Sequence, residues 1–281
     1  TVMNIPPKIF AQYDCGNLID LVRNELWEEK QQRTPNIERT KRFFETNEKI
    51  LCVAVINSED VIRLDYRYYD RGDVTFSGNI VQDSLDFNDL EKLIGDVIKD
   101  HSEISAIGLS LPGIIEDDQI MIPARIHLAG ADIIGKLKEK FKRRVYAFND
   151  VNMISTGVYW LEDRYRTLIT YFLPDHSIEG GAGIVVNGHL VRGEHSLAGE
   201  VLYLVKLLQL SDKPEVLRES EDGLHELIAK TIIPMIVTVG PEAVYIVNND
   251  IKEIVGLRQK ICEYIPEKFC PDIIRLENME N

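Results

Sequence analysis

The chain has 281 residues, of which 44% are hydrophobic and 28% charged, as in an ordinary globular protein of one or two domains. Its 32 Lys and Arg against 46 Asp and Glu give a net charge of −14 at pH 7, which disfavours direct binding to nucleic acids and anionic membranes. No apolar run reaches the ~18 residues that a membrane span needs, and the N-terminus lacks a signal-peptide pattern, so we expect a cytoplasmic protein.

Metal and redox chemistry have little support in the sequence. The four cysteines form no C-x-x-C pair, and Cys262 and Cys270 are too far apart for a usual zinc knuckle. We interpret the cysteines as buried thiols of a reducing compartment, with a redox or metal role as the alternative. His176, His189 and His195 share no ligand-like spacing, so we expect no metal site.

The first 47 residues differ in pattern from the rest of the chain. Apolar residues at helical spacing, with Trp27 among them, predict a helix over 16–32, and a more polar helix is expected over 36–46. Basic and acidic residues are equal in number here, unlike in a DNA-reading helix-turn-helix. We therefore expect residues 1–47 to form a helical arm or linker, and the helix over 16–32 is a candidate dimer surface.

Residues 48–150 predict a small α/β lobe. Period-two patterns at 50–56 and 61–69, joined by a polar turn, predict a hairpin. An amphipathic helix over 86–100 leads to a buried strand at 105–111 that ends at Pro112-Gly113. The remaining elements expected are a strand at 119–122, a helix at 131–142 and a strand at 144–148. The order β-β-α-β-α-β indicates helices layered over a mixed sheet.

Residues 151–281 predict a larger α/β lobe that begins like the first, with its C-terminus as a candidate point of truncation. Strands are expected at 168–173, 183–188, 189–193 and 243–248. Helices are expected over 222–239, interrupted by Pro234, and over 250–264. Two lobes of similar plan predict a ligand cleft between them.

Three short segments carry groups suited to ligand binding. Asn149 and Asp150 follow a strand and open a helix, where α/β proteins place ligand contacts, although position alone favours helix capping. The glycine-dense segment 180–193 allows close approach to a phosphate or sugar, but ligand-free glycine-rich hairpins are common. In Ala198-Gly199-Glu200 the carboxylate could accept hydroxyl hydrogen bonds or be simply solvated.

Taken in order, these segments resemble the ROK family of bacterial sugar kinases and sugar-responsive repressors. The resemblance rests on GLSLPGII at 108–115, on the Asn-Asp-Val-Asn at 149–152, and on residues 181–188 followed by 198–200, and it covers about residues 48–265. It implies the two-lobed actin-like ATPase (ribonuclease H-like) fold, an α/β fold with the ligand cleft between its lobes, and a homodimer.

The resemblance also implies roles for single residues. Gly113 would line a sugar site, and Asn149, Asp150 and Glu200 would bind sugar hydroxyls. In the family's kinases the residue that matches Asp150 is the general base, and phosphoryl transfer from Mg-ATP needs such a group to orient the attacking hydroxyl.

This sequence departs from the family pattern in the segments that bind the nucleotide in the family's kinases. At the first hairpin Asn57 and Ser58 are followed by two carboxylates in place of a glycine-rich phosphate loop, and like charge disfavours a triphosphate. Residues 174–179 differ before Gly180, Gly181 and Gly183, the remnants of the second loop. Residues 248–250 replace a glycine run. Tyr203 stands where most members have a histidine, and no cysteine cluster follows, so we expect no zinc.

These observations favour a catalytically silent sugar-sensing module without a cofactor, the effector-binding domain of a transcriptional regulator or a descendant of one. The alternative is a divergent kinase that transfers phosphate from Mg-ATP to a hexose or N-acetylhexosamine, with Asp150 as base. A scaffold that binds neither ligand is the third hypothesis, which Tyr203 and the missing zinc cluster favour.

Overall fold

The computed structural model describes residues 48–57, 61–71, 73–116, 119–121, 132–162, 164–174, 178 and 180–276. The arm predicted over 1–47 lies outside the described residues. The chain divides into two compact units between Met153 and Ile154, inside helix α4 (Asp150–Leu161). We call the described residues up to Met153 the N-unit and those from Ile154 the C-unit, and each is described by itself.

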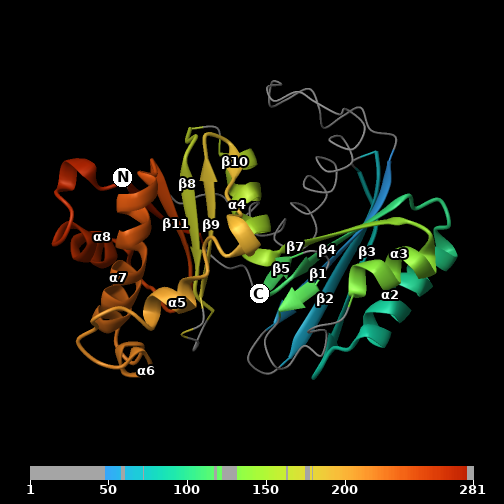
Figure 1. The fold of residues 1–281 in the computed structure, drawn as a ribbon, viewed down its shortest axis with the longest axis horizontal. Coiled ribbons are helices and arrows are strands. Elements are labelled where there is room, and N and C mark those ends of the chain that lie inside the picture. The colour runs from blue at the N-terminus through green and yellow to red at the C-terminus, as the bar shows by residue number, and fades with distance from the viewer. Residues whose placement is uncertain are drawn as a thin grey trace. The chain divides into compact units, whose positions relative to one another are not determined.

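The N-unit is a five-stranded mixed sheet of order β3-β2-β1-β4-β7. Strand β2 runs antiparallel to β1, whereas β4 and β7 run parallel to it. Helices α2 and α3 lie side by side on one face of this sheet (Figure 1). The elements are β1 (Lys49–Asn57), β2 (Ile62–Asp70), β3 (Asp73–Gln82), α2 (Phe87–Asp100), β4 (Ala106–Leu111), β5 (Ile114–Glu116), β6 (Gln119–Met121), α3 (Ile133–Phe141) and β7 (Arg144–Asn149).

Local sequence explains the position of α2. Asp86 accepts a hydrogen bond from the Asp89 backbone N–H at 3.0 Å, and the Asp89 carboxylate accepts one from the Asp86 N–H at 3.0 Å. This reciprocal capping box fixes the start of the helix. Leu90, Ile94 and Val97 then recur at helical spacing and are buried against the sheet.

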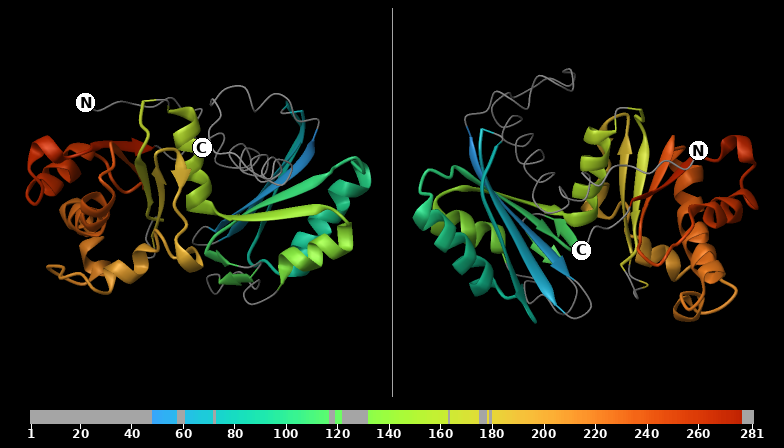
Figure 2. Two further views of the ribbon diagram at one scale, coloured as in Figure 1. Left: turned by 45° about the horizontal axis from the view of Figure 1, so that its top comes forward. Right: turned by 180° about the vertical axis from the view of Figure 1, so that it is seen from behind.

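The C-unit repeats the same strand order, third-second-first-fourth-fifth, as β10-β9-β8-β11-β12. The prediction that the two halves begin alike is therefore confirmed. Helices α7 and α8 cover one face of the sheet, and α4 lies on the other (Figure 2). The elements are β8 (Leu168–Phe172), β9 (Gly181–Val186), β10 (His189–Leu190), η2 (Glu194–Ser196), α5 (Val201–Val205), α6 (Pro214–Leu217), α7 (Glu221–Val239), β11 (Ala243–Val247), α8 (Ile254–Cys262), η3 (Glu267–Phe269) and β12 (Asp272–Leu276).

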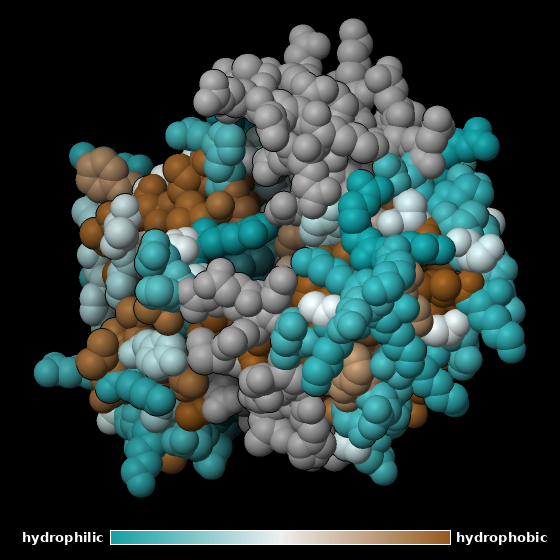
Figure 3. Space-filling model, turned by 45° about the vertical axis from the view of Figure 1, so that its right-hand side comes forward, coloured by the Kyte–Doolittle hydropathy of each residue, from teal (hydrophilic) through white to brown (hydrophobic). Residues whose placement is uncertain are grey.

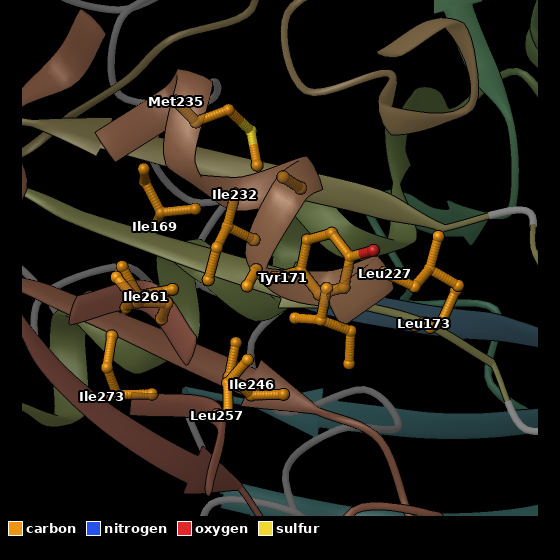
Figure 4. Close-up of a cluster of buried hydrophobic side chains, with 14 of the residues drawn as sticks. Ile169, Tyr171, Leu173, Leu227, Ile232, Met235, Ile246, Leu257, Ile261 and Ile273 are labelled. Atoms are coloured by element: carbon orange, nitrogen blue, oxygen red, sulfur yellow. The ribbon is translucent and has the colours of Figure 1, made fainter. Parts of the chain in front are cut away.

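Apolar side chains of α7 and α8 pack onto β8, β11 and β12 to form the core of the C-unit. Figure 4 shows Ile232 and Met235 of α7 above the strands, with Leu257 and Ile261 of α8 beside them. Burial of side chains of this kind stabilises a fold by about 1.5–3 kcal/mol each relative to exposure. The prediction that Pro234 interrupts the helix is wrong, because α7 continues through Pro234. Buried apolar side chains on both sides of Pro234 stabilise the helix although proline has no backbone N–H to donate.

Several element boundaries differ from expectation. Strand β3 was not predicted, and it pairs along β2 at the edge of the sheet with almost every residue exposed. Strand β12 was not predicted either, and it joins the C-unit sheet parallel to β11. The expected strand over 189–193 is only two residues long, because Gly193 turns away with φ of 70°. Asn187 and Gly188 both have positive φ, as a type I′ turn requires.

The described surface mixes polar and apolar residues, as the face in Figure 3 shows. Val81 of β3, Tyr203 and Leu207 are among the large apolar side chains that remain exposed. Within the described ranges, no helix combines the length and apolarity that a membrane span requires.

Candidate functional site

The carboxyl ends of β4 and β7 form one edge of the N-unit sheet. The two strands are parallel neighbours, and Leu111 is paired with Asn149 at their ends. The residues that follow, Gly113 after β4 and Asp150 after β7, are therefore brought to the same edge. Open α/β sheets bind ligands at such edges.

Asn149 is held by two hydrogen bonds. Its Nδ2 donates to the Gly113 carbonyl at 2.9 Å, and its Oδ1 accepts from the Asn152 backbone N–H at 2.9 Å. Asn149 is thus the N-cap of α4, which confirms the capping interpretation. The bond to Gly113 ties the two strand ends together, and Gly113 has φ of 101°, a conformation that favours glycine. One of the two Nδ2 hydrogens is used in this way.

Asp150 is the first residue of α4 and the acidic residue of its first turn. Its Oδ1 accepts a hydrogen bond from the Val151 backbone N–H at 2.7 Å. The positive end of the helix dipole stabilises a carboxylate at this position. An oriented carboxylate of this kind can accept a hydrogen bond or a proton from a hydroxyl group.

Glu200 belongs to the C-unit and follows a loop, residues 193–199, whose backbone has several left-handed residues. Gly193, His195, Ser196 and Gly199 all have positive φ within this loop. The Gly199 carbonyl accepts a hydrogen bond from the Ala182 N–H at 2.8 Å, so the loop lies directly on β9. Strained backbone that the surroundings hold in place is common at ligand sites.

The Glu200 carboxylate is half-buried at the N-cap position of α5, where it makes no capping bond. Burial raises the pKa of Glu200 above its ordinary value. Among the described residues no ion pair or side-chain hydrogen bond offsets this burial. A carboxylate that is desolvated and unpaired is a candidate for ligand binding.

The remaining predicted nucleotide residues lie in or beside strands. Asn57 ends β1, and Ser58 lies outside the described residues. Gly181 and Gly183 are regular positions of β9, opposite Phe172 and Thr170 of β8. Gly180 approaches β8 so closely that a Cβ would lie 2.7 Å from the Phe172 carbonyl oxygen. Gly180 therefore serves the close contact between the two strands, and Gly181 and Gly183 are paired residues of β9.

The carboxyl edge of the C-unit sheet uses a second asparagine in the same way as the first. Asn248, directly after β11, is 3% exposed. Its Nδ2 donates to the Leu173 carbonyl at the end of β8 at 2.9 Å, and its Oδ1 accepts from the Ile251 N–H at 3.0 Å. Sequence reasoning treated Asn248 as a lost glycine and missed this structural role.

At the same carboxyl edge of the C-unit sheet, charged side chains bond to other groups of the chain. Arg218 is 7% exposed and donates from Nη2 to Oδ2 of Asp250 at 2.6 Å. Oε1 of Glu221 accepts from the backbone N–H groups of Lys252 at 3.3 Å and Glu253 at 3.1 Å. These two N–H groups, at the N-cap position of α8 and one residue before it, would otherwise be donors for an anion. The sequence gives no local signal for either contact, because both join residues about 30 positions apart.

The other predicted residues add no metal site. No group of three or more His, Cys, Asp and Glu suited to a metal ion occurs in the part of the chain that the structure describes. His189 and His195 are exposed, and His176 lies outside the described residues. Tyr203 lies on α5 and is 52% exposed.

Two sheets of identical strand order, each with polar groups at its carboxyl edge, define the class of doubled α/β proteins to which the actin-like ATPases belong. Within that class the chain belongs to the ROK family, whose sequence profile matches residues 54–202, more than half of the chain. The predicted family is therefore confirmed.

Two curated relatives have different activities. A glucokinase of Halalkalibacterium halodurans is 31% identical over 116 residues, which are 40% of this chain and 34% of that protein. A xylose repressor of Caldicellulosiruptor bescii is 27% identical over 117 residues, 41% of this chain and 29% of that protein. The matches thus span only about a third of these relatives.

Solved structures confirm the predicted fold. The Lmo2764 protein of Listeria monocytogenes superimposes with a TM-score of 0.64 at 15% identity, over 83% of this chain and 94% of that one. At this identity the likeness concerns the fold alone, the actin-like ATPase fold.

Proposed function

We propose that the chain is a sugar-binding module of the ROK family that does not transfer phosphate, the effector-binding part of a transcriptional regulator or a descendant of one. The proposed ligand is a hexose or an N-acetylhexosamine. Gly113, Asn149 and Asp150 of the N-unit and Glu200 of the C-unit are the proposed contacts to its hydroxyl groups. A similar repressor and a similar glucokinase are both compatible with sugar recognition.

The observation that carries this proposal is that charged groups at the carboxyl edge of the C-unit sheet bond to one another. Asp250 neutralises Arg218, and Glu221 accepts hydrogen bonds from the N–H groups of Lys252 and Glu253, just before the first helical residue of α8. A triphosphate needs cations and backbone donors to offset its charge, and here carboxylates occupy both. The residues of this edge do not fit a nucleoside triphosphate, and we derive no phosphoryl-transfer step.

The support for sugar binding comes from Glu200 and Asn149. Among the described residues no ionic partner offsets the burial of the Glu200 carboxylate, so hydroxyl donors from a ligand would restore lost hydrogen bonds. Asn149 is locked in one orientation by Gly113 and Asn152, which reduces the entropy that a ligand must remove. These features support binding of a polyhydroxylated ligand.

Asp150 favours the second candidate, a divergent sugar kinase. Its carboxylate lies at a helix N-terminus, a position that favours negative charge, and could take the proton of an attacking hydroxyl. The kinase hypothesis requires Mg-ATP to bind despite Asp250 and Glu221. It therefore differs from the sensor hypothesis in a measurable way.

Thermal unfolding of the full chain with a panel of hexoses, N-acetylhexosamines and Mg-ATP tests the proposal. A ligand at 100 times its Kd adds about 2.7 kcal/mol of stability. We expect stabilisation by a sugar and none by Mg-ATP. Glu200→Gln should weaken sugar binding at least tenfold, about 1.4 kcal/mol, whereas Glu194→Gln, in the same loop and exposed, should not.

Two outcomes would reject the proposal. Absence of any stabilisation by the sugar panel would reject sugar binding and favour the scaffold hypothesis. Stabilisation by Mg-ATP, with phosphorylated sugar that disappears in Asp150→Asn, would establish the kinase instead. Asp96→Asn is the matched control, because Asp96 is an exposed aspartate of α2 away from the edge.

A further inference from the structure

We propose that Cys262 and Cys270 are a modification site, a dithiol that low-molecular-weight disulfides such as oxidised glutathione convert reversibly into an intramolecular disulfide. This proposal concerns the outer part of the C-unit and does not depend on sugar binding.

The fold brings the two thiols together. Cys262 is the last residue of α8, and Cys270 lies between η3 and β12, so only seven residues separate them. The Cys262 thiol lies within hydrogen-bonding reach of the Cys270 thiol. Both are free thiols. A disulfide requires such proximity before any backbone movement.

The segment between the cysteines is held by further contacts. The Cys270 N–H donates to the Glu267 carbonyl at 3.1 Å. The Arg258 guanidinium, one turn before Cys262, pairs with the Glu267 carboxylate at 3.1 Å. These bonds tie the end of α8 to the turn before β12, so thiol proximity is a property of the folded chain.

An oxidant can reach the pair. Cys262 and Cys270 are both partly exposed, and their neighbours Tyr264 and Phe269 are 56% and 63% exposed. Cys52, in contrast, is completely buried in β1. The chain therefore contains its own control, because an oxidant that requires access should leave Cys52 unmodified.

The charges around the pair suit thiol exchange. The Arg258 guanidinium interacts electrostatically with both sulfur atoms. Burial, followed by the neighbouring Cys262 thiol, raises the pKa of Cys270 to about 12. We therefore assign Cys270 as the resolving thiol, which leaves Cys262 as the first nucleophile, and the proximity of Cys270 to the mixed disulfide offsets its low ionisation.

The exchange balances without another reactant. The Cys262 thiolate, after losing its proton to solvent, attacks one sulfur of the small disulfide and expels the first small thiolate. Cys270 loses its proton and attacks the Cys262 sulfur of the mixed disulfide, which expels the second. The small disulfide gains the two electrons that the two cysteines lose, and the expelled thiolates take up two protons.

Peptide mapping of the folded full chain tests the proposal. The protein is equilibrated in glutathione buffers of graded ratio, quenched in acid and digested with trypsin without reductant. Cleavage after Lys260, Lys268 and Arg275 places the two cysteines in separate peptides, 261–268 and 269–275. We expect a linked pair of these peptides, lighter by two hydrogens than their sum and separated by reductant.

Variants and stability provide further readouts. Cys262→Ser and Cys270→Ser should each abolish the linked pair, and Cys52 should remain unmodified in all three proteins. Oxidation should raise the Tm of the wild type and leave that of Cys262→Ser unchanged, because closing a loop restricts the unfolded chain. If the two cysteines instead remain reduced or carry separate glutathione adducts at every buffer ratio, the proposal is wrong.

Discussion

Replacing Asn248 by alanine tests the hydrogen bonds that organise the carboxyl edge of the C-unit. The substitution removes the donor to the Leu173 carbonyl and the acceptor for the Ile251 N–H, both in a buried setting. A buried polar group left without a partner costs about 1–3 kcal/mol. With two such groups we expect Asn248→Ala to lower the free energy of unfolding by about 2–6 kcal/mol.

Asn248→Asp separates the two bonds. Aspartate keeps an acceptor for the Ile251 N–H but directs a second acceptor at the Leu173 carbonyl, so we expect a large loss of stability at neutral pH. Urea unfolding measures the total effect, and hydrogen exchange of the Ile251 amide measures the local one. Gln259→Ala, an exposed amide on α8, serves as the control and should change stability by less than about 0.5 kcal/mol.

The reasoning fails if Asn248→Ala costs less than about 1 kcal/mol while Ile251 exchange stays slow. It also fails if Asn248→Asp is as stable as the wild type at pH 7, because the donor bond to Leu173 would then contribute nothing.

Two further predictions concern the C-unit. Burial lowers the pKa of His225, whose ring lies against Gly256. The unfolded chain therefore binds a proton at His225 more readily than the folded chain does. The resulting stability is present above pH 6.5 and is lost as the pH falls below it, by at most about 1.4 kcal/mol at pH 5.5. His225→Gln should flatten this part of a urea-unfolding profile between pH 7.5 and 5.5, and an unchanged slope would contradict the assignment. Gly199→Ala would place a Cβ 1.8 Å from the Ala182 carbonyl oxygen at φ of 90°, so it should cost more than about 2 kcal/mol and weaken sugar binding. Gly240→Ala, at φ of 62° with open space around it, should cost only about 1 kcal/mol, and equal losses in the two variants would refute the packing argument.

The sequence predicted the elements whose residues are buried on a regular period. Strands β1, β2, β4 and β7 and helix α2 were all expected, because burial against one core imposes periods of two or 3.6. Strand β3 was not predicted because its side chains are mostly exposed and follow no apolar period, whereas backbone pairing with β2 forms the strand. Strand β12 was not predicted for a related reason. It forms by pairing with β11, from which helix α8 separates it in the sequence.

The candidate site was predictable where one segment carries both the motif and its role. Asn149 and Asp150 follow a strand and open a helix, so position and residue type together indicate a capped, ligand-facing edge. The contacts that close the C-unit edge were not predictable. Arg218 meets Asp250 only because α6 and the end of β11 are brought together by the packing of α7 on the sheet, which no local pattern encodes.

Asn149 and Asn248 make equivalent hydrogen bonds at the carboxyl edges of the two sheets, although these edges carry different charged groups. Asn149 is the last residue of β7 and Asn248 directly follows β11. Each donates to a carbonyl just after the neighbouring strand and accepts from the N–H three residues later. In the N-unit the next residue is Asp150, a carboxylate at a helix N-terminus. In the C-unit the carboxylate of Asp250 instead neutralises Arg218 of the same unit. The same arrangement therefore places a carboxylate at a helix N-terminus in one unit and pairs a carboxylate with an arginine in the other, the distribution that the proposed sugar-binding function without a nucleotide requires.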